Sequence, residues 1–240
     1  MSKKKLVVFS IGGKGGVGKS WLVTLLADWY ASRKQSFHAV DLDNENNTLM
    51  RFYPAAQFVE LSSERELDGM LNAIVGGDQA LTLMDMRAAS TDRVEPWLRQ
   101  VDFEELSREH SIKFTAIGVV DTSEDSVNNI GYWAGDVLKK AKGMRYIIAQ
   151  NKVRGTELAY EKSSQRKQYR ERLDLAEIEI PKLDEWVHAK LESENKSVGA
   201  ALAVDDAKSP FTEFMTRARL KRYQGTMFAE FEKVKERLLP

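Results

Sequence analysis

The sequence predicts one α/β domain spanning 1–240, built on a mostly parallel, twisted sheet with helices on both faces. Three observations lead to this fold class. A chain of 240 residues is long enough for one sizeable domain with a buried core. Short apolar runs alternate with helical stretches, and several of these runs end in carboxylates or amides. A glycine-rich loop joins the first apolar run to the first helical stretch.

The first three predicted strands are short apolar runs. Residues 6–11 are β-branched and aromatic, with lysines before them and glycines after them, which is typical of a buried central strand. The helix after the glycine loop is predicted over 21–30, where apolar residues recur at helical spacing. Residues 38–43 and 80–85 are the next two strands, and each ends in an aspartate.

The second half of the chain continues the alternation. Strands are expected at 114–120, 145–149 and 178–181, with a helical stretch at about 127–140 between the first two. From about residue 183 a basic, helical C-terminal part follows, with the sequence RARLKR at 217–222 opening a helix. Because parallel strands of such a sheet bind ligands at their carboxyl ends, the polar strand ends should gather at one edge.

Composition removes several classes of function. Lys plus Arg and Asp plus Glu each number 36, so net charge alone favours neither nucleic acid nor an anionic membrane as partner. The absence of cysteine excludes disulfides, thiolate metal sites and a cysteine nucleophile, and is compatible with a reducing compartment. No apolar stretch approaches the roughly 18 residues of a membrane span, and the apolar run at 6–11 is too short for a signal peptide. We therefore expect a cytoplasmic protein.

Residues 13–20 read GKGGVGKS and match the pattern G-x-x-x-x-G-K-[ST] in full, between a predicted strand and a predicted helix. The glycines let backbone N–H groups converge on phosphate oxygens, and the helix N-terminus adds its partial positive charge. Lys19 is expected to reach the β- and γ-phosphates, and Ser20 to give its hydroxyl to Mg²⁺. A glycine-rich turn without a ligand is the alternative. The residues expected at the nucleotide are Gly13, Lys14, Gly15, Gly16, Val17, Gly18, Lys19, Ser20 and Trp21.

An additional lysine, Lys14, makes the loop read K-G-G-x-G-K-S. Here the sequence resembles the deviant Walker A ATPases, which include the ParA plasmid-partition, MinD septum-placement and nitrogenase iron-protein families. The resemblance covers about residues 6–181 and implies a P-loop NTPase fold, ATP and Mg²⁺ as cofactors, slow hydrolysis and a homodimer formed on ATP binding. It also implies that Lys14 reaches the nucleotide of the partner subunit, as an arginine finger does elsewhere. A lysine that contacts only its own nucleotide or the solvent is the alternative.

Three carboxylates are expected to complete the site. The family carries D-x-D at the end of its second strand, and Asp41 and Asp43 occupy that place. By resemblance, Asp41 supports the magnesium shell through water and Asp43 orients the attacking water; a solvated strand end is the alternative for Asp43. Asp85 ends its strand as a Walker B carboxylate does, and would hold the metal directly or through a water, together with Ser20. Residues 86–90 (MRAAS) depart from the family's small, proline- or glycine-containing switch, which leaves the coupling of hydrolysis to motion open.

Asn151 matches the asparagine with which ParA and MinD relatives contact the adenine ring. The aspartate that follows Asn-Lys in guanine-specific P-loop proteins is absent, because Val153 and Arg154 come next. We therefore expect ATP to be preferred over GTP. A plain turn former is the alternative for an asparagine at a strand end.

Two basic segments are candidates for contacting duplex DNA without sequence preference, since contacts to phosphates add up through counterion release. A solvated helix face is the alternative for both segments. The candidate residues are Lys162, Arg166, Lys167, Arg170 and Arg172 in the first segment, and Arg217, Arg219, Lys221 and Arg222 in the second.

The sequence favours other functions of this family less than contact with DNA. Apolar residues from Met227 to Leu238 recur at helical spacing, as in MinD relatives that bind membranes, but their polar face has no cationic excess, which favours packing against the sheet. The metal-cluster role of the iron protein needs cysteine ligands and is excluded. A metabolic kinase is disfavoured by Lys14. Because the phosphate loop begins almost at once, the chain is similar to small single-domain plasmid proteins of the StbB and TraL type, which implies a separate adaptor protein that stimulates the ATPase.

Overall fold

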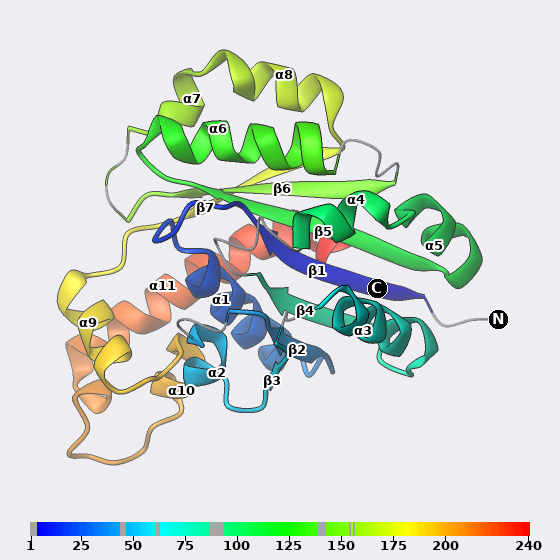
Figure 1. Ribbon diagram of the computed structural model, residues 1–240. Coiled ribbons are helices and arrows are strands. Elements are labelled where there is room, and N and C mark those ends of the chain that lie inside the picture. Colours follow the sequence, from blue (N-terminus) through cyan, green and yellow to red (C-terminus); the bar gives the residue numbers. More distant parts are fainter. Residues whose placement is uncertain are drawn as a thin grey trace.

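The computed structural model describes residues 4–43, 47–60, 63–86, 94–138, 143–153, 155 and 157–240. Within these residues the centre of the molecule is a seven-stranded sheet in the order β3-β2-β4-β1-β5-β6-β7, and every pair of neighbouring strands is parallel (Figure 1). The predicted α/β fold with a parallel sheet and helices on both faces is therefore confirmed. The strands are β1 (Lys5–Ile11), β2 (His38–Asp41), β3 (Gln57–Phe58), β4 (Leu81–Asp85), β5 (Ile112–Val120), β6 (Met144–Asn151) and β7 (Leu175–Ile180).

Helices connect the strands and cover the sheet. Twelve α-helices, one π-helix and one 3₁₀-helix lie within the described part of the chain. They are α1 (Lys19–Ser32), α2 (Thr48–Phe52), α3 (Glu64–Gly76), α4 (Val94–Gln100), α5 (Phe103–His110), α6 (Glu124–Tyr132), the π-helix η2 (Trp133–Val137), α7 (Ala159–Lys162), α8 (Ser164–Arg172), α9 (Glu185–Ser193), α10 (Val198–Leu202), the 3₁₀-helix η3 (Pro210–Thr212), α11 (Phe214–Lys233) and α12 (Lys235–Leu238).

The six strands expected from the sequence are all present, with shifted ends. β2 stops at Asp41, two residues before the predicted end. β6 runs through Asn151, which therefore ends a strand instead of following one. The two-residue β3 at the sheet edge was not predicted, since neither of its side chains is buried and no alternation marks it. The helix expected at about 127–140 divides into α6 and η2.

The sheet separates two hydrophobic clusters. On one face α1, α9, α10 and α11 pack against each other and the sheet, around side chains such as Leu26, Trp29 and Phe231 (Figure 1). On the other face α3 to α6 and η2 cover the sheet, around Phe114, Trp97 and other apolar side chains. Tyr160 of α7 and Tyr169 of α8 join this second cluster, so α8 and α11 belong to opposite faces.

The apolar stripe of the C-terminal helices lies in the core. Met227, Phe231 and Leu238 are fully buried, and Val234 is 5% exposed, all in the cluster that contains α1. The stripe therefore packs against the body of the protein, as its balanced polar face predicted. Among the described residues, no helix combines the length and the apolar character that crossing a membrane requires.

Polar contacts fasten α1 to the C-terminal helices. The indole Nε1 of Trp21 donates to the Tyr223 hydroxyl at 2.9 Å. The carboxylate of Asp28 accepts from the Ser197 hydroxyl at 2.6 Å and from the Gly199 amide at 2.7 Å, at the N-terminus of α10. Because α1 begins at the phosphate loop, the helices after β7 are held against the same element that positions the site.

Candidate nucleotide-binding site

The phosphate loop lies between the end of β1 and the start of α1, as its sequence context predicted. Gly12, Gly16 and Gly18 have φ values of 118°, 71° and 100°, a region in which the backbone of any residue other than glycine is strained. Gly18 is the residue before α1 and has a second reason to be glycine. A Cβ atom built there would lie 2.5 Å from Nδ2 of Asn151. The loop therefore needs glycine for its conformation and for its contact with β6.

The carboxyl ends of the central strands meet at a cavity beside this loop. Because all neighbouring strands are parallel, the segments that follow β1, β2, β4, β5 and β6 arrive at one edge of the sheet. The cavity is lined by Gly15, Gly16, Val17, Gly18, Lys19, Ser20, Trp21, Asp43, Thr48, Met86, Asp121, Asn151, Val153, His188 and Glu192. Of the predicted nucleotide and metal residues, Gly13, Lys14, Asp41 and Asp85 are not among those lining it.

Lys19 is buried at the base of the loop. Its Nζ donates to the backbone carbonyl of Lys14 at 2.7 Å, so the ammonium bridges the two ends of the loop. Burial lowers the pKa of Lys19, and the negative charges of Asp85 and Asp43 partly offset this effect. An ammonium at this position can exchange the backbone carbonyl of Lys14 for a phosphate oxygen as its hydrogen-bond acceptor.

Asp85 is fully buried at the end of β4. Its Oδ1 accepts from the Ser10 hydroxyl at 3.1 Å, and the Ser20 hydroxyl also donates to the carboxylate. Its Oδ2 has no hydrogen-bond partner among the described residues. Burial raises the pKa of Asp85 to about 7, in spite of the hydrogen bond from Ser20. A buried carboxylate oxygen without a partner, beside a serine hydroxyl, fits the oxygen ligands that Mg²⁺ prefers.

The two aspartates after β2 have different environments. Asp41 pairs in register with Asp85 across the β2–β4 ladder. Its Oδ1 accepts from the Asp43 amide at 2.9 Å and its Oδ2 from the Met50 amide at 3.1 Å. Burial raises the pKa of Asp41, and these backbone hydrogen bonds oppose the rise. Asp41 therefore holds the segment after β2 in place, whereas Asp43 lines the cavity and interacts with the charge of Lys19.

Lys14 points to α6 of its own chain in this structure. Its Nζ donates to the Ser123 hydroxyl at 2.5 Å and lies 3.6 Å from a carboxylate oxygen of Asp125. Ser123 also donates to Asp121 through its amide at 3.0 Å and its hydroxyl at 2.5 Å. The neighbouring Gly13 amide donates to Oδ1 of Asn129 in α6. The first half of the phosphate loop is therefore held against the start of α6.

Asn151 contacts the phosphate loop. Its Nδ2 donates to the carbonyl of Val17 at 2.8 Å, and its Oδ1 accepts from the Val153 amide at 3.1 Å. The side chain thus ties β6 to the loop and to the segment after β6. The adenine contact that the resemblance implies stays a prediction. Arg154, the switch residues 87–90 after Asp85 and the polar residues 44–46 lie outside the described residues.

Six lining residues were not named as site residues from the sequence. They lie in α2, in the segments that follow β4, β5 and β6, and in α9, and they are Thr48, Met86, Asp121, Val153, His188 and Glu192. Asp121 follows a predicted strand, and that position alone could have suggested it. Nothing in the sequence near His188 or Glu192 indicates the cavity, because only the packing of α9 beside α1 brings them there.

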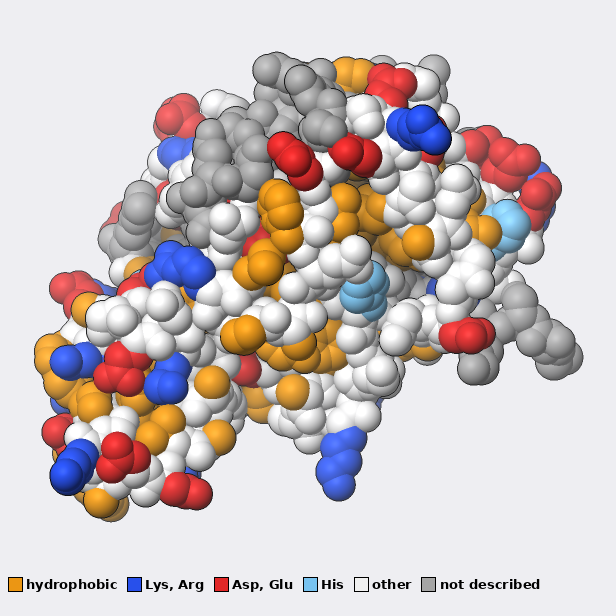
Figure 2. All heavy atoms as spheres, turned by 60° about the horizontal axis from the view of Figure 1, so that its bottom comes forward, with side chains coloured by type: hydrophobic (Ala, Val, Ile, Leu, Met, Phe, Trp, Pro, Cys, Tyr) orange, Lys and Arg blue, Asp and Glu red, His pale blue; other side chains and the backbone are white. Residues whose placement is uncertain are grey.

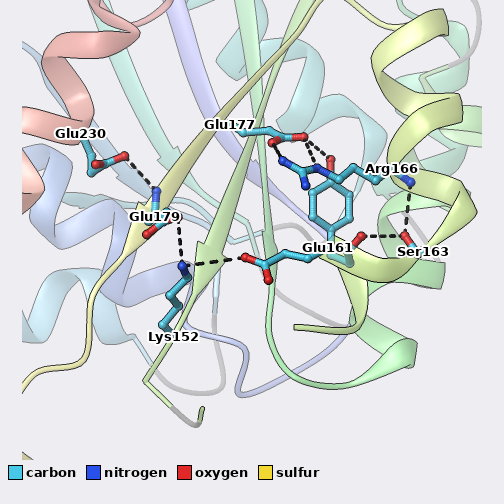
Figure 3. A network of polar contacts seen from close by, with 8 residues as sticks. Lys152, Glu161, Ser163, Arg166, Glu177, Glu179 and Glu230 are labelled. Carbon is cyan, nitrogen blue, oxygen red and sulfur yellow. Dashed lines mark hydrogen bonds and ion pairs between the residues drawn. The ribbon is translucent and has the colours of Figure 1, made fainter. Parts of the chain in front are cut away.

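The two basic segments lie on opposite faces of the sheet, and several of their cations already have partners. Arg166 pairs with Glu177 of β7 through two hydrogen bonds of 3.1 and 2.5 Å, next to the Lys152–Glu179 pair at 2.9 Å (Figure 3). Arg217 donates to the carbonyls of residues 202 and 204, and Arg219 lies 3.4 Å from Asp184. The other candidates, Lys162, Lys167, Arg170, Arg172, Lys221 and Arg222, have exposed side chains.

Lys and Arg do not gather into one patch on the face shown in Figure 2. There the basic side chains are interspersed with acidic ones, including on the lobe at the lower left. Lys162 and Lys167 likewise have acidic neighbours, Glu157 at 3.0 Å and Glu171 at 3.9 Å. On this face, contact with DNA would therefore use separate exposed cations and not a continuous basic surface.

The fold and this site define a P-loop nucleotide-binding protein. The sequence profile of the CbiA family, described as the CobQ/CobB/MinD/ParA nucleotide binding domain, matches residues 8–198. The chain belongs to that family. Its resemblance to the MinD and ParA ATPases, first indicated by Lys14 and the loop that follows it, is thereby confirmed. A search of curated protein sequences found no match to the chain.

Solved structures agree with the fold. A chain of the MinC:MinD cell division protein complex of Aquifex aeolicus superposes with a TM-score of 0.60 at 13% identity, covering 98% of this chain and 97% of that one. The MinD cell division protein of Aquifex aeolicus gives 0.55 at 12% identity, covering 98% and 99%. A plasmid partition protein from Borrelia burgdorferi gives a lower TM-score of 0.45 at 12% identity, covering 80% and 96%. At these identities the likeness concerns the fold.

Proposed function

We propose that this protein is an ATP-dependent molecular switch, which dimerises around Mg-ATP and hydrolyses it slowly to position, segregate or transfer cargo such as plasmid DNA. The observation that carries the proposal is the phosphate loop itself. Three of its glycines adopt positive φ, and Lys19 is buried beneath it. The buried Asp85 carboxylate accepts a hydrogen bond from Ser20, and among the described residues its Oδ2 has no hydrogen-bond partner. Membership of the MinD and ParA family supports the same function.

Each group at the cavity has a role in this proposal. Lys19 would leave the Lys14 carbonyl and bind the β- and γ-phosphates, and backbone amides of the loop would bind the remaining oxygens. Ser20 and Asp85 would hold Mg²⁺, which when bound neutralises charge on the phosphate oxygens. Asp43, which faces the cavity, would orient the attacking water. Asp41 would act on the metal site through the segment that it holds.

Lys14 would change partners when the dimer forms. In the single chain it contacts Ser123 and Asp125, and its side chain is 28% exposed. Its pair with Asp125 is weak, because the Asp125 side chain is 85% exposed and water screens the charges. Lys14 could therefore leave Asp125 at small cost. On reaching the nucleotide of a second copy it would exchange its hydrogen bond to Ser123 for contacts with phosphate oxygens, where it would stabilise charge during phosphoryl transfer.

Phosphate release in the presence of Mg²⁺ and ATP tests the switch. The native protein should hydrolyse ATP, Lys19→Ala should lose nucleotide binding, and Asp43→Asn should bind ATP but lose turnover. Lys113→Ala, which removes an exposed lysine at the amino-terminal end of β5, is the matched control and should keep full activity. Equal hydrolysis by the native protein and Lys19→Ala would reject the assignment of the site.

For the cargo, we propose non-specific duplex DNA, contacted by exposed cations such as Lys167 and Arg170 of α8. A gel shift with ATP should retard DNA, and the affinity should fall steeply between 50 and 200 mM salt if several phosphates are neutralised, by as much as ~10³-fold. Reversing the charges of Lys167 and Arg170 should weaken DNA binding. Reversing the charges of Lys221 and Arg222 of α11 tests whether the second segment contacts DNA. A shift that is insensitive to all four changes would contradict both assignments.

Two alternatives to DNA are an output at a membrane and an accessory role in a secretion or conjugation machinery without direct DNA binding. The stripe from Met227 to Leu238, which could have bound lipid, is buried against the core and supports the membrane alternative poorly. An adaptor protein that stimulates hydrolysis is proposed as a further partner. MinD of Aquifex aeolicus forms a cell division protein complex with MinC. Sedimentation with anionic vesicles, beside the gel shift, separates these outputs.

A further inference from the structure

The cavity beside the phosphate loop has an aromatic wall that the proposed phosphate and metal chemistry does not use. Trp21 directly follows Ser20, and His188 projects from α9, more than 160 positions later in the chain. Both residues line the same cavity as residues 15–20 of the loop. The centroids of their rings are 4.9 Å apart, and the rings meet edge to face at 69°. Two elements distant in sequence thus bring π systems next to the site.

Trp21 is held rigidly. Its Nε1 donates to the Tyr223 hydroxyl at 2.9 Å, and its ring packs edge to face with Phe52 at 6.2 Å. The side chain is 8% exposed, so most of it is fixed by the core while the remainder faces the cavity. An aromatic ring that is fixed before a ligand arrives loses little conformational freedom on binding.

Within the part of the chain that the structure describes, the helix holds His188, and no hydrogen bond reaches its ring. Asp184 caps the N-terminus of α9, and its carboxylate accepts from the amides of Trp186 and Val187 at 3.2 and 3.3 Å. The backbone amide of His188 donates to the Asp184 carbonyl at 2.9 Å, which fixes the first turn. In an edge-to-face pair, the ring that contributes its edge keeps both of its faces clear of its partner. A flat heterocycle could therefore pack against this wall.

Asn151 already makes two hydrogen bonds within the protein. Its amide nitrogen is engaged by the loop carbonyl of Val17, and its oxygen by the Val153 amide. A base that took over either contact would have to compete with a hydrogen bond that holds the loop. Trp21 and His188 offer a contact that needs no such exchange.

We propose that Trp21 and His188 form the wall against which the heterocyclic base of the bound nucleotide packs, which makes His188 a specificity-determining residue. The inference rests on the proposed function, because it takes the ligand to be a nucleoside triphosphate with its phosphates in the loop. Stacking of a base on an aromatic side chain increases with the size of the base and is tolerant of its hydrogen-bonding pattern. The wall therefore favours purine over pyrimidine nucleotides and discriminates little between adenine and guanine.

Isothermal titration calorimetry with Mg²⁺ and three probes tests the wall: ATP, CTP and inorganic tripolyphosphate, which carries the phosphates without a base. His188→Ala should weaken ATP binding about tenfold, since one base–aromatic contact typically contributes that much or more. Its binding of tripolyphosphate should stay within about twofold of the native value. His188→Phe keeps an aromatic ring and should retain most of the affinity for ATP. Trp186→Ala, on the same helix, is the matched control, because Trp186 is 46% exposed and does not line the cavity.

The outcomes distinguish failure of the aromatic wall from failure of the proposed phosphate site. If the native protein binds tripolyphosphate and ATP equally well, or if His188→Ala weakens both probes alike, the wall is rejected and the phosphate site stands. If His188→Ala leaves ATP binding unchanged, the wall is also rejected. If the native protein binds none of the three probes, the proposed function fails and the wall fails with it. Selective loss of ATP affinity that His188→Phe restores supports the wall.

Discussion

Gly18→Ala is the substitution whose effect follows most directly from the coordinates of the phosphate loop. Gly18 has φ 100° and ψ 24°, in the left-handed region, immediately before α1. A Cβ atom there would lie 2.5 Å from Nδ2 of Asn151, well inside van der Waals contact. The same nitrogen donates to the Val17 carbonyl at 2.8 Å. One added methyl group would therefore strain the backbone and displace the side chain that ties β6 to the loop.

The expected loss of stability can be assembled from these contacts. A left-handed conformation costs a residue with a Cβ about 1–2 kcal/mol relative to glycine. Losing the Asn151–Val17 hydrogen bond costs about 1 kcal/mol more. Alanine restricts the unfolded chain and returns about 0.4–1 kcal/mol. The free energy of unfolding should therefore fall by about 1–3 kcal/mol, and the melting temperature by about 3–10 °C for a chain of this size.

Urea unfolding without nucleotide measures this loss, with Gly15→Ala as the matched control. Gly15 belongs to the same loop, does not have positive φ, and has no atom within 4 Å of the position that a Cβ would occupy. The control should stay within about 0.5 kcal/mol of the native protein. Asn151→Ala should make the loss from Gly18→Ala smaller, because the clash partner is gone. Equal stability of the two glycine variants would refute the reasoning.

Three further predictions concern other parts of the structure. Burial raises the pKa of Asp28 to about 6 from 3.8, so the folded state binds this proton more tightly, and the stabilising contribution present below pH 4 is lost as the pH rises through 6. Relative to Asp28→Asn, the native protein should therefore lose up to about 3 kcal/mol between pH 4 and 7, measured by urea unfolding; a constant difference would contradict the raised pKa. Asp125→Asn should ease the release of Lys14 and raise the dimerisation constant with Mg-ATP. The increase should be at most about fivefold, because the Lys14–Asp125 pair is exposed, and sedimentation can measure it. Phe231→Ala should lower the free energy of unfolding by about 3–5 kcal/mol, since its fully buried ring packs 5.7 Å from that of Trp29, and a loss below 1 kcal/mol would argue against that core position.

The central strands and the phosphate loop could be predicted from sequence because their signals are local. The run at 6–11, the glycines and Lys19-Ser20 stand next to one another, and a buried parallel strand followed by such a loop leaves few alternatives. The carboxylates Asp41 and Asp85 could be placed because each ends a strand, and parallel strands bring their ends together. The same logic placed Asn151 at this edge.

Contacts between distant segments could not be predicted. His188 reaches the cavity only because α9 packs beside α1, and no spacing in the sequence records that packing. The separation of the two basic segments onto opposite faces has the same origin, since α8 follows β6 while α11 follows β7. The pairing of Arg166 with Glu177 likewise depends on where α8 meets β7. Composition shows the charges but not their partners.

Light scattering with a non-hydrolysable ATP analogue and Mg²⁺ tests most directly whether the protein is a nucleotide-dependent dimer. The mass of the native protein should rise from 27.3 kDa to twice that value with the analogue and remain at 27.3 kDa without it. Lys14→Ala should bind the analogue, as a parallel titration verifies, and remain a single chain. A native protein that binds the analogue and keeps a mass of 27.3 kDa, or a Lys14→Ala variant that dimerises as readily as the native chain, would contradict the proposed switch.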